Sequence, residues 1–382
     1  MSDVLARLPN YTCLQTTERS RVFRRGGAQL IDLVRMEVAL VDGKELYAWP
    51  GSKNFDDTRI IDMVKDGAIS NGNFAIHAKS VFESRNPQFA FMGERAEQNG
   101  RRVLQWNFVV SQSSSGYTLR SRGEQAIVGY HGSFLADATT LDVIRLEIHA
   151  DNIPKALQME AASDVVEYAL AALGEQSFLL PVSAELNITD TGGDGSRNRT
   201  TFSACRQYRG ESKITFDDPA NTASDANTNR SLEMPAGLLL DVALESPIEQ
   251  GRAAVGDPIT AILKKPVTFG DGLSAPKGAV LHGRITFLRH LQGATGWVVG
   301  LTFVEMEWKD TRAKLQVKLA VIPSLLQLTS RSPRYRALVA QTALEPDMFI
   351  VPEPRLSLTR GFAMQWRTDA LPPQNRTSSG RP

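Results

Sequence analysis

The chain has 382 residues, and its 43 Lys and Arg against 42 Asp and Glu leave a formal net charge of +1. This balance favours neither nucleic acid nor an acidic membrane surface, so we expect no nucleic-acid partner. The length exceeds what one hydrophobic core usually serves, which predicts two domains. No stretch approaches the roughly 20 apolar residues that cross a bilayer, so we expect a protein that does not span the membrane.

The N-terminal region starts with strand-like patterns. Residues 11–16 read as a strand that contains Cys13, and residues 29–41 alternate in the manner of a second. Asp42-Gly43 then predicts a type I′ turn, because both central positions of that turn need positive φ. Residues 45–49 return as the other arm of the hairpin.

Two helices are predicted to interrupt the strands. Residues 56–65 and 73–84 carry apolar side chains at helical spacing, as in Phe74, His77, Val81 and Phe82. Short helices inserted into a long antiparallel sheet would cover one of its faces and give it an interior.

Strand patterns fill the remainder of the first region. They cover residues 89–92, 102–110, 117–120, 126–136, 141–150, 165–173, 176–180, 184–189 and 199–208. We therefore predict a mainly β chain whose first domain, 1–210, is a large curved antiparallel sheet with helices near 56–84, its strands following one another as a meander.

Cys13 and Cys205 lie at opposite ends of this domain. If the first and last strands are neighbours, the two could form a disulfide closing a loop of 205 − 13 = 192 residues. Two free buried thiols are the alternative. A disulfide would imply an oxidising compartment, whereas the N-terminal residues lack the features of a secretory signal and, taken literally, predict a cytoplasmic protein.

The second half begins after a polar stretch. Residues 211–231 are predicted to be a linker, since they offer little apolar surface to bury, and residues 371–382 to be a disordered tail. Between them, 232–240, 273–281 and 356–364 share one turn-and-strand pattern. Pro presets φ at the second turn position and Gly serves at the fourth position of a type I turn, with Thr359 replacing Pro in the third copy. A small β-barrel or sandwich over 232–370 is predicted.

Two motifs of this second domain carry a resemblance. Met234-Pro235-Ala236-Gly237-Leu238-Leu239-Leu240 and Pro276-Lys277-Gly278-Ala279-Val280-Leu281-His282-Gly283 are similar to turn-and-strand signatures in the β-barrel domain of type IV secretion scaffold proteins. The resemblance covers about a quarter of the chain. It implies a barrel fold and an envelope protein as partner.

The first domain resembles the periplasmic lipoprotein carriers and the sensor proteins built on the same fold. The likeness rests on strand order, the helical insert at 56–84, Tyr11-Thr12-Cys13 and the strand at 143–147. It implies a curved sheet that shelters a lipid or lipoprotein acyl chain. The combination of both domains also resembles secreted bacterial proteins of uncharacterised function, which implies a periplasmic or secreted location.

Motifs for catalysis are absent from the sequence. The five histidines, His77, His131, His149, His282 and His290, have no metal-ligand spacing. Nucleophile-elbow and phosphate-loop patterns are also missing. We expect no catalytic residues, no metal site and no cofactor.

Two residue groups are candidates for binding. A hydrophobic ligand cleft could be lined by Phe74, Val81, Phe82, Phe91, Trp106 and Phe108, although an ordinary core would also account for them. The cluster Arg19, Arg21, Arg24 and Arg25 could bind phosphate headgroups, or could be a solvated strand edge.

Three functions remain open. The first is a non-enzymatic envelope protein that binds a lipid or other hydrophobic ligand in the N-terminal sheet; a cavity between residues 74–82 and the sheet would support it. The second is a protein–protein interaction or scaffold module of an envelope assembly. The third is an unrecognised hydrolase, which needs a cleft with convergent polar residues.

Overall fold

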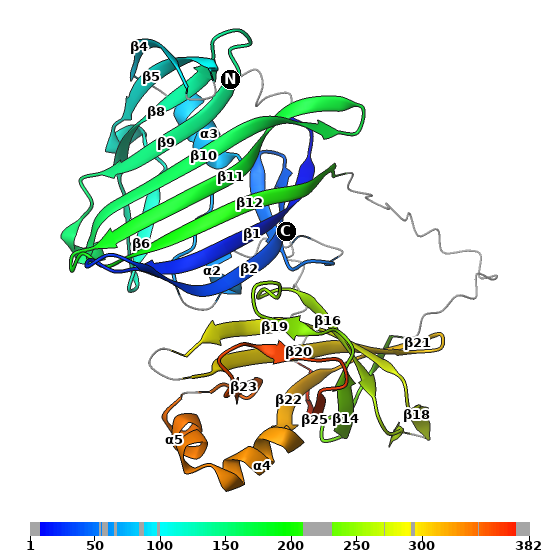
Figure 1. The fold of residues 1–382 in the computed structure, drawn as a ribbon. Coiled ribbons are helices and arrows are strands. Elements are labelled where there is room, and N and C mark those ends of the chain that lie inside the picture. The colour runs from blue at the N-terminus through cyan, green and yellow to red at the C-terminus, as the bar shows by residue number, and fades with distance from the viewer. Residues whose placement is uncertain are drawn as a thin grey trace, which may run out of the picture. The chain divides into compact units, whose positions relative to one another are not determined.

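The structure is a computed structural model that describes residues 8–52, 55, 60–64, 67–83, 88–97, 100–208, 231–270, 272–291, 295–342 and 344–371. The chain divides into two compact units, Met1–Lys213 and Ile214–Pro382. Most of the expected linker 211–231 and tail 371–382 lies outside the described residues. The mainly β prediction is confirmed, with a large antiparallel sheet and short helices in the first unit and a curled half-barrel sheet in the second (Figure 1).

The first unit is built on a ten-stranded antiparallel sheet with the order β3-β2-β1-β12-β11-β10-β9-β8-β5-β4. Its strands are β1 (Tyr11–Val22), β2 (Ala28–Val41), β3 (Lys44–Ala48), β4 (Gln88–Ala96), β5 (Arg102–Val110), β8 (Gly129–Asp137), β9 (Val143–Asp151), β10 (Met159–Leu173), β11 (Gln176–Asp190) and β12 (Gly195–Gln207). The order departs from the expected meander, because β1 pairs with β12 and the first three strands extend the far side of the sheet.

This order explains the helical insert. The chain leaves the sheet at β3, on one edge, and re-enters at β4, on the other, so the segment between them must cross the sheet. Its described helices are α2 (Ile60–Met63) and α3 (Ile76–Phe82), and α3 begins later than predicted because residues 73–75 form a turn. Both lie on one side of the sheet (Figure 1), which we call the inner face.

Strand periodicity determines which side chains reach the inner face. Along β1, Tyr11, Cys13, Gln15, Thr17 and Arg19 alternate as buried residues. The two-residue turn between β2 and β3 is confirmed, with Asp42 and Gly43 at φ of 50° and 78°. Apolar and polar side chains are both buried on this face.

Two strand predictions need correction. The run 126–136 is not one strand, since β7 (Glu124–Ile127) pairs with β6 (Thr118–Ser121) in a separate hairpin and β8 begins at Gly129. Val128 breaks the run because its N–H donates to the Tyr117 carbonyl. Conversely, 176–180 and 184–189 belong to one strand, β11, where a bulge at Val182 accommodates Pro181.

The disulfide is present. Cys13 of β1 and Cys205 of β12 are bonded, with a Cα–Cα distance of 4.1 Å. The two strands shift register between Thr12 and Leu14, and Ala204 takes a φ of 48° at this bulge. Pairing of the first and last strands therefore brings together cysteines that are 192 residues apart.

The second unit contains a curled sheet with the order β13-β21-β20-β19-β16-β14-β25-β22, and β23 pairs with β20. Its strands are β13 (Ser231–Glu233), β14 (Leu239–Leu244), β16 (Pro258–Leu263), β19 (Val280–His290), β20 (Trp297–Trp308), β21 (Thr311–Lys314), β22 (Gln316–Val321), β23 (Met348–Val351) and β25 (Ala363–Asp369). Two further pairs join β15 (Ile248–Glu249) to β24 (Ser357–Leu358) and β17 (Val267–Phe269) to β18 (Leu273–Ala275).

The repeated turn-and-strand units precede β14, β19 and β25. Gly237, Gly278 and Gly361 all have φ near the left-handed region, between 89° and 95°. The Ala279 N–H donates to the Pro276 carbonyl, and Phe362 repeats this contact with Thr359. The glycine is thus the third residue of a type II turn, not the fourth of a type I turn, and that position requires positive φ.

Helices α4 (Pro323–Arg331) and α5 (Pro333–Gln341) were not predicted. They follow β22, and Tyr335 of α5 packs against Val298 and Ile350 while its hydroxyl donates to the Ile350 carbonyl. Within the described part of the chain, no helix is long and apolar enough to cross a membrane.

Candidate functional site

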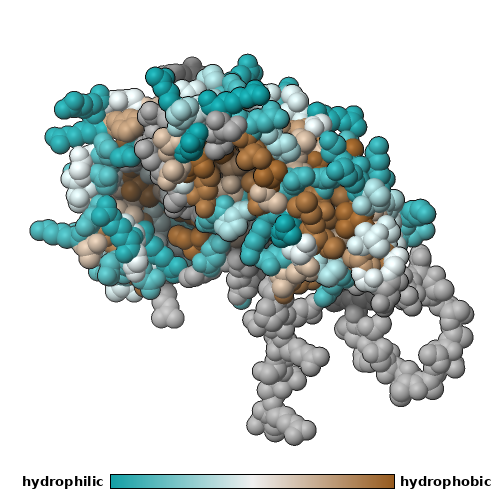
Figure 2. Space-filling model, turned by 90° about the horizontal axis from the view of Figure 1, so that it is seen from below, coloured by the Kyte–Doolittle hydropathy of each residue, from teal (hydrophilic) through white to brown (hydrophobic). Residues whose placement is uncertain are grey.

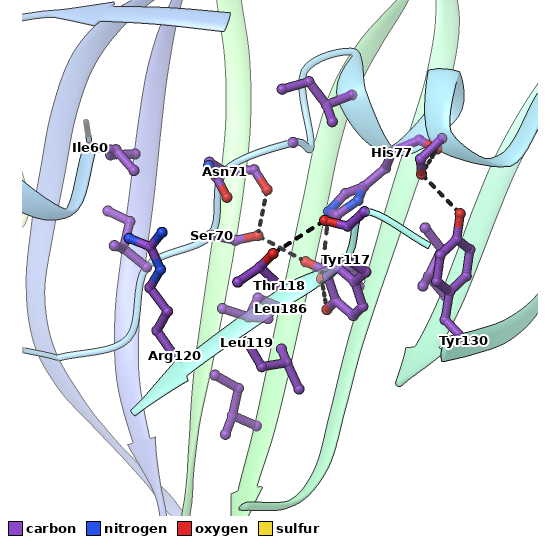
Figure 3. A pocket seen from close by; sticks show the side chains of 18 of the residues that line it. Ile60, Ser70, Asn71, His77, Tyr117, Thr118, Leu119, Arg120, Tyr130 and Leu186 are labelled. Carbon is purple, nitrogen blue, oxygen red and sulfur yellow. Dashed lines mark hydrogen bonds and ion pairs between the residues drawn. The ribbon is translucent and has the colours of Figure 1, made fainter. Parts of the chain in front are cut away.

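A pocket of about 430 Å³ lies between the helical insert, the β6–β7 hairpin and the inner face of the first sheet (Figure 3). The insert contributes residues from Ile60 to Ser80, the hairpin contributes residues 116–120, and β8 to β11 form the floor. This volume lies within the usual range for sites that bind small molecules.

Much of the pocket wall is apolar. Ile69 and Ile76 face it from the insert, Leu119 from the hairpin, and Ile148 and Leu186 from the sheet. Leu186 and Ile148 are inner-face residues of alternating strands, so their burial follows from strand periodicity. These side chains would remove apolar parts of a ligand from water.

The hairpin is held over the end of β10 by its own small core. Leu119 and Val128 pack with Leu157 and Ala162, all of them buried. The hairpin also carries Tyr117 into the pocket (Figure 3). This segment therefore acts as one wall, fixed independently of the insert.

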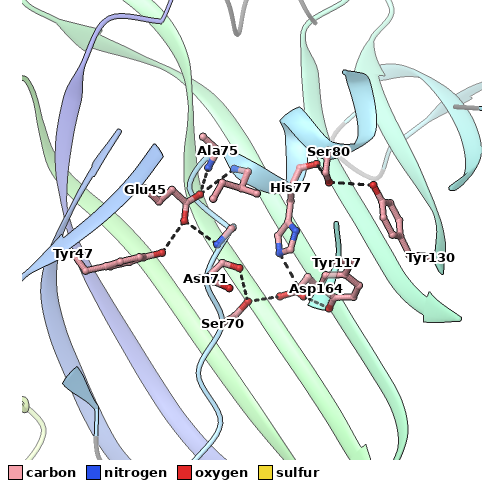
Figure 4. Close-up of polar contacts among 12 residues, drawn as sticks. Glu45, Tyr47, Ser70, Asn71, Ala75, His77, Ser80, Tyr117, Tyr130 and Asp164 are labelled. Atoms are coloured by element: carbon pink, nitrogen blue, oxygen red, sulfur yellow. Dashed lines mark hydrogen bonds and ion pairs between the residues drawn. The ribbon is translucent and has the colours of Figure 1, made fainter. Parts of the chain in front are cut away.

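A buried polar cluster is centred on Asp164 of β10, which lies on the sheet floor between its strand partners Ile148 of β9 and Leu186 of β11 (Figure 4). The Tyr117 hydroxyl donates to Asp164 Oδ2 at 2.8 Å, and the Ser70 hydroxyl donates to Oδ1 at 3.3 Å. His77 Nε2 of α3 lies 3.6 Å from Oδ2, and the Asp164 side chain is 1% exposed. We call Ser70, His77, Tyr117 and Asp164 the polar cluster.

Glu45 of β3 fixes the loop that presents this cluster. Its carboxylate accepts hydrogen bonds from the N–H groups of Gly72, Ala75 and Ile76, and from the Tyr47 hydroxyl at 2.7 Å (Figure 4). A carboxylate satisfies N–H groups at the start of a helix that would otherwise lack partners. The position of His77 on α3 thus depends on a contact from a strand at the sheet edge.

A second tether joins α3 to the sheet. The Tyr130 hydroxyl of β8 donates to Ser80 Oγ at 3.1 Å, and Ser80 in turn donates to the His77 carbonyl at 2.9 Å. Tyr130 also lines the pocket. Hydrogen bonds as well as apolar contacts therefore hold the insert to the sheet.

The tyrosines of this unit give a testable pH dependence. Burial raises the pKa of Tyr11, Tyr47, Tyr117, Tyr130 and Tyr168, and for Tyr117 the nearby Asp164 carboxylate adds to this effect. Tyrosine in the unfolded chain titrates at about pH 10. The folded state retains protons that the unfolded state releases, so this contribution to stability is present below about pH 10 and is lost as the pH rises through the folded pKa values.

We therefore expect the free energy of unfolding of the first unit to fall between about pH 9 and about pH 11. Urea unfolding at a series of pH values measures it. Tyr117→Phe removes one tyrosine whose pKa is raised. The free energy of unfolding of this variant should therefore fall less steeply with pH. A stability that is constant over this range would contradict the expectation.

A second hollow of about 630 Å³ adjoins the pocket. Ile61, Ile69, Arg120, Met159 and Ile188 line both. Arg120 is exposed, and Figure 3 draws it at the end of the pocket away from His77 and Tyr117. The pocket thus has a buried polar end at Asp164 and an end at Arg120 that continues into the second hollow, which is also lined by Arg122, Asp62, Glu124 and Asp190.

The six predicted ligand-binding residues do not line this pocket. Phe74, Val81 and Phe108 are buried, Phe82 and Trp106 are half-buried, and Phe91 is 59% exposed. Phe74 packs on Tyr11 and Phe202, with ring centroids 4.6 and 5.4 Å away. A role of these six in ligand binding stays a prediction.

The other aromatic side chains form a row along β4, β5 and β8. Phe91 faces Trp106 at 5.1 Å between ring centroids, Trp106 stacks on Phe134 at 5.1 Å, and Phe82 of α3 contacts Phe134 at 5.0 Å. Phe89 and Phe108 complete the row at 6.5 Å. The row ties α3 to the β4 edge of the sheet.

In the structure, the arginines of this cluster lie in different environments. Arg19 is buried and forms two hydrogen bonds with Asp32 of β2, at 2.7 and 2.5 Å. Arg21 pairs with Asp194 at 3.1 Å on the surface. The two do not share one exposed face, because the Arg19 side chain is 2% exposed whereas that of Arg21 is 45% exposed.

The residues that sequence reasoning missed are Asp164, Tyr117 and Ser70. Asp164 lies just before the predicted strand 165–173, yet it shares strand parity with Ala162 and Val166, which are buried. That parity is the signal that places a carboxylate on the inner face. Helical spacing places His77 on the apolar side of its helix, and the structure buries it there.

Among the described residues, no group of three or more His, Cys, Asp and Glu side chains could hold a metal ion. His131 and His149 stack with ring centroids 5.3 Å apart and contact Asp151 and Glu147, respectively. Both project from the outer face, since their strand neighbours Tyr130 and Ile148 face inward.

Comparison with known proteins gives one similar solved structure. No family model and no curated protein sequence matches the chain. A LolA superfamily protein from Nitrosomonas europaea aligns with 56% of this chain and 96% of its own, at 10% sequence identity and a TM-score of 0.29.

Proposed function

We propose that the first unit is a non-enzymatic binding module that holds one hydrophobic or amphipathic molecule between its insert and its sheet. The observation that carries this proposal is the pocket of about 430 Å³, whose wall combines apolar side chains with one buried polar cluster. A mostly apolar hollow with a few convergent polar groups is the usual form of a small-molecule site. A lipid or an acyl chain fits this chemistry.

The location that we propose is the cell envelope, in the periplasm or secreted. The Cys13–Cys205 disulfide supports it, because structural disulfides persist in oxidising compartments. The linked strands β1 and β12 are interior strands of the sheet that bears the pocket.

The polar cluster does not have the geometry of a hydrolase. In a serine triad the histidine lies between the serine and the carboxylate, where it takes the proton from the serine. Here Asp164 lies between them, since it accepts from Ser70 on one oxygen while His77 faces the other. Ser70 therefore has no histidine beside it of the kind that a serine triad requires, and we propose binding without catalysis.

A scaffold role for the second unit is the other candidate. Figure 2 shows brown hydrophobic areas between teal hydrophilic ones on one face of the molecule. In the second unit, Leu326 of α4 is 57% exposed and Val304 of β20 is 44% exposed. Exposed apolar side chains favour contact with a protein partner where they form a patch.

Blocking the pocket tests the binding proposal. Ile188, half-buried on β11, lines both hollows, so Ile188→Trp should fill the space between them. We expect this variant to weaken binding of the uncharged dye phenylnaphthylamine about tenfold or more, a loss of about 1.4 kcal/mol. Fluorescence titration of the full chain measures the dissociation constant.

Leu170→Trp is the matched control, because Leu170 is 64% exposed on the neighbouring strand β10 and does not line the pocket. It should leave the affinity unchanged. Equal affinities of the two variants and the unmodified protein would contradict the proposal, as would a protein that does not bind the dye.

A further inference from the structure

In the polar cluster, the hydroxyl hydrogens are used in hydrogen bonds, whereas the oxygens can accept further ones. The Tyr117 hydroxyl hydrogen goes to Asp164, and that of Ser70 goes to Asp164 or to the Asn71 carbonyl at 3.2 Å. The hydrogens of Tyr130 and Ser80 are used in the second tether. Each of these oxygens retains lone pairs, so these hydroxyl and carboxylate groups can still accept hydrogen bonds.

His77 adds an unused atom to the same place. Its Nε2 is buried and has no hydrogen-bond partner, since the 3.6 Å to Asp164 Oδ2 exceeds a normal hydrogen bond. The His77 side chain is 6% exposed and lines the pocket. A buried polar atom without a partner costs free energy that a ligand group could recover.

Within the part of the chain that the structure describes, this end of the pocket contains one carboxylate, that of Asp164. Among the described residues, His77 is the one basic group within 4.0 Å of the Asp164 carboxylate. Burial and the Asp164 carboxylate raise the pKa of Tyr117, so its hydroxyl stays protonated at neutral pH and remains a neutral donor. A buried carboxylate is stabilised by further donors or by a positive charge.

We propose that the ligand of this pocket carries a hydrogen-bond-donating head group, an amine or an alcohol, which binds at Asp164 and His77 while its apolar part lies along Leu119, Met159 and Ile188. This inference rests on the proposed binding function and names the class of ligand. A carboxylate or phosphate head is excluded from this end, because it would meet Asp164 in a site with little water. The exposed Arg120, at the other end, is where an anionic head would bind instead.

Three amphiphiles with the same ten-carbon chain test the head-group preference: decylamine, decanol and decanoate. Calorimetric titration of the full chain near neutral pH, below the concentrations at which the amphiphiles aggregate, measures each affinity. We expect decylamine and decanol to bind, and decanoate to bind at least about tenfold more weakly. A stronger preference for decylamine than for decanol would identify the charge of Asp164 as the larger contribution.

Asp164→Asn keeps the shape of the side chain and removes its charge. It should reduce the affinity for decylamine by about tenfold and narrow the difference between decylamine and decanoate. The matched control is Asp151→Asn, because Asp151 also contacts a histidine, His131, at 2.7 Å, but on the outer face. This control should leave all three affinities unchanged.

A measurement on the unmodified protein covers the case in which Asp164→Asn does not fold. Nuclear Overhauser contacts should join the methylene next to the head group to the rings of Tyr117 and His77. Contacts from that methylene to Arg120 instead would overturn the inference.

The outcomes test the head-group inference separately from the proposed binding function. If none of the three amphiphiles binds, the proposed function is wrong. If all bind and decanoate binds as tightly as decanol, the binding function stands and the head-group inference is wrong.

Discussion

Removing the Cys13–Cys205 disulfide is expected to lower the free energy of unfolding of the first unit by about 5 kcal/mol, the value that the chain-entropy model gives for a loop of 192 residues. The bond joins β1 to β12, so it ties the three N-terminal strands to the long run of strands that ends at β12. Without the disulfide, the unfolded chain gains the conformational entropy that the closed loop removes. This loss is comparable to the whole stability of many domains.

The variant for this test is Cys13→Ala with Cys205→Ala, which leaves no unpaired thiol. Urea unfolding followed by tryptophan fluorescence measures the stability. Trp49 and Trp106 lie in the first unit, and Trp297, Trp308 and Trp366 lie in the second. The transition of the second unit serves as the internal control and should not move; a change below about 1 kcal/mol in the first unit would contradict the expectation.

Breaking the Arg19–Asp32 pair should have the next largest effect. Both side chains are almost fully buried, at 2% and 3% exposed, and two hydrogen bonds join them. Asp32→Ala removes the carboxylate and leaves the guanidinium charge inside the sheet. We expect a loss of about 3–5 kcal/mol in the free energy of unfolding, as for other buried pairs that lose one partner.

The double variant Arg19→Met with Asp32→Leu distinguishes the cost of burying the Arg19 charge without the Asp32 carboxylate from the value of the pair. Replacing both charges by apolar groups of similar volume should restore most of the stability that Asp32→Ala loses. Arg199→Ala is the control at an exposed pair on the same sheet, where Arg199 contacts Glu185 at 3.0 Å, and should cost at most about 1 kcal/mol. Equal losses in the single and double variants would show that packing, and not charge, stabilises this site.

Local patterns in the sequence predict much of the fold. Alternation along β1 and β2 predicts both strands, and Asp42-Gly43 predicts their turn toward β3 because both residues take positive φ. A Cys13–Cys205 disulfide is expected only if the first and last strands of the unit pair. In the structure these strands pair and the disulfide is present. In these cases the deciding interaction is either close in sequence or marked by a rare residue type.

What the sequence did not predict depends on contacts between distant segments. The order of strands follows from the pairing of β1 with β12, and no local pattern encodes it. Arg19 reads as a surface residue because charged side chains are mostly exposed, whereas its burial depends on Asp32 lying opposite it on β2. A register shift beside this pair also changes which side chains share a face.

The polar cluster could be predicted only in part for the same reason. Strand parity places Asp164 on the inner face, and helical spacing places His77 on the buried side of α3. Their meeting requires the insert to cross the sheet from β3 to β4, which is a property of topology. Tyr117 reaches them from the β6–β7 hairpin, whose second arm alone is merged with the following strand in the predicted run 126–136.

Native mass spectrometry of the full chain, isolated without detergent from cells that produce it, tests the central claim most directly. We expect a population of protein that carries one bound amphipathic molecule, and this population should be lost in Ile188→Trp and retained in Leu170→Trp. Fragmentation of the released molecule would then show an apolar chain. A chain that stays free of ligand after isolation, and that also takes up no added amphiphile, would contradict the proposal that this sheet and its insert form a binding site.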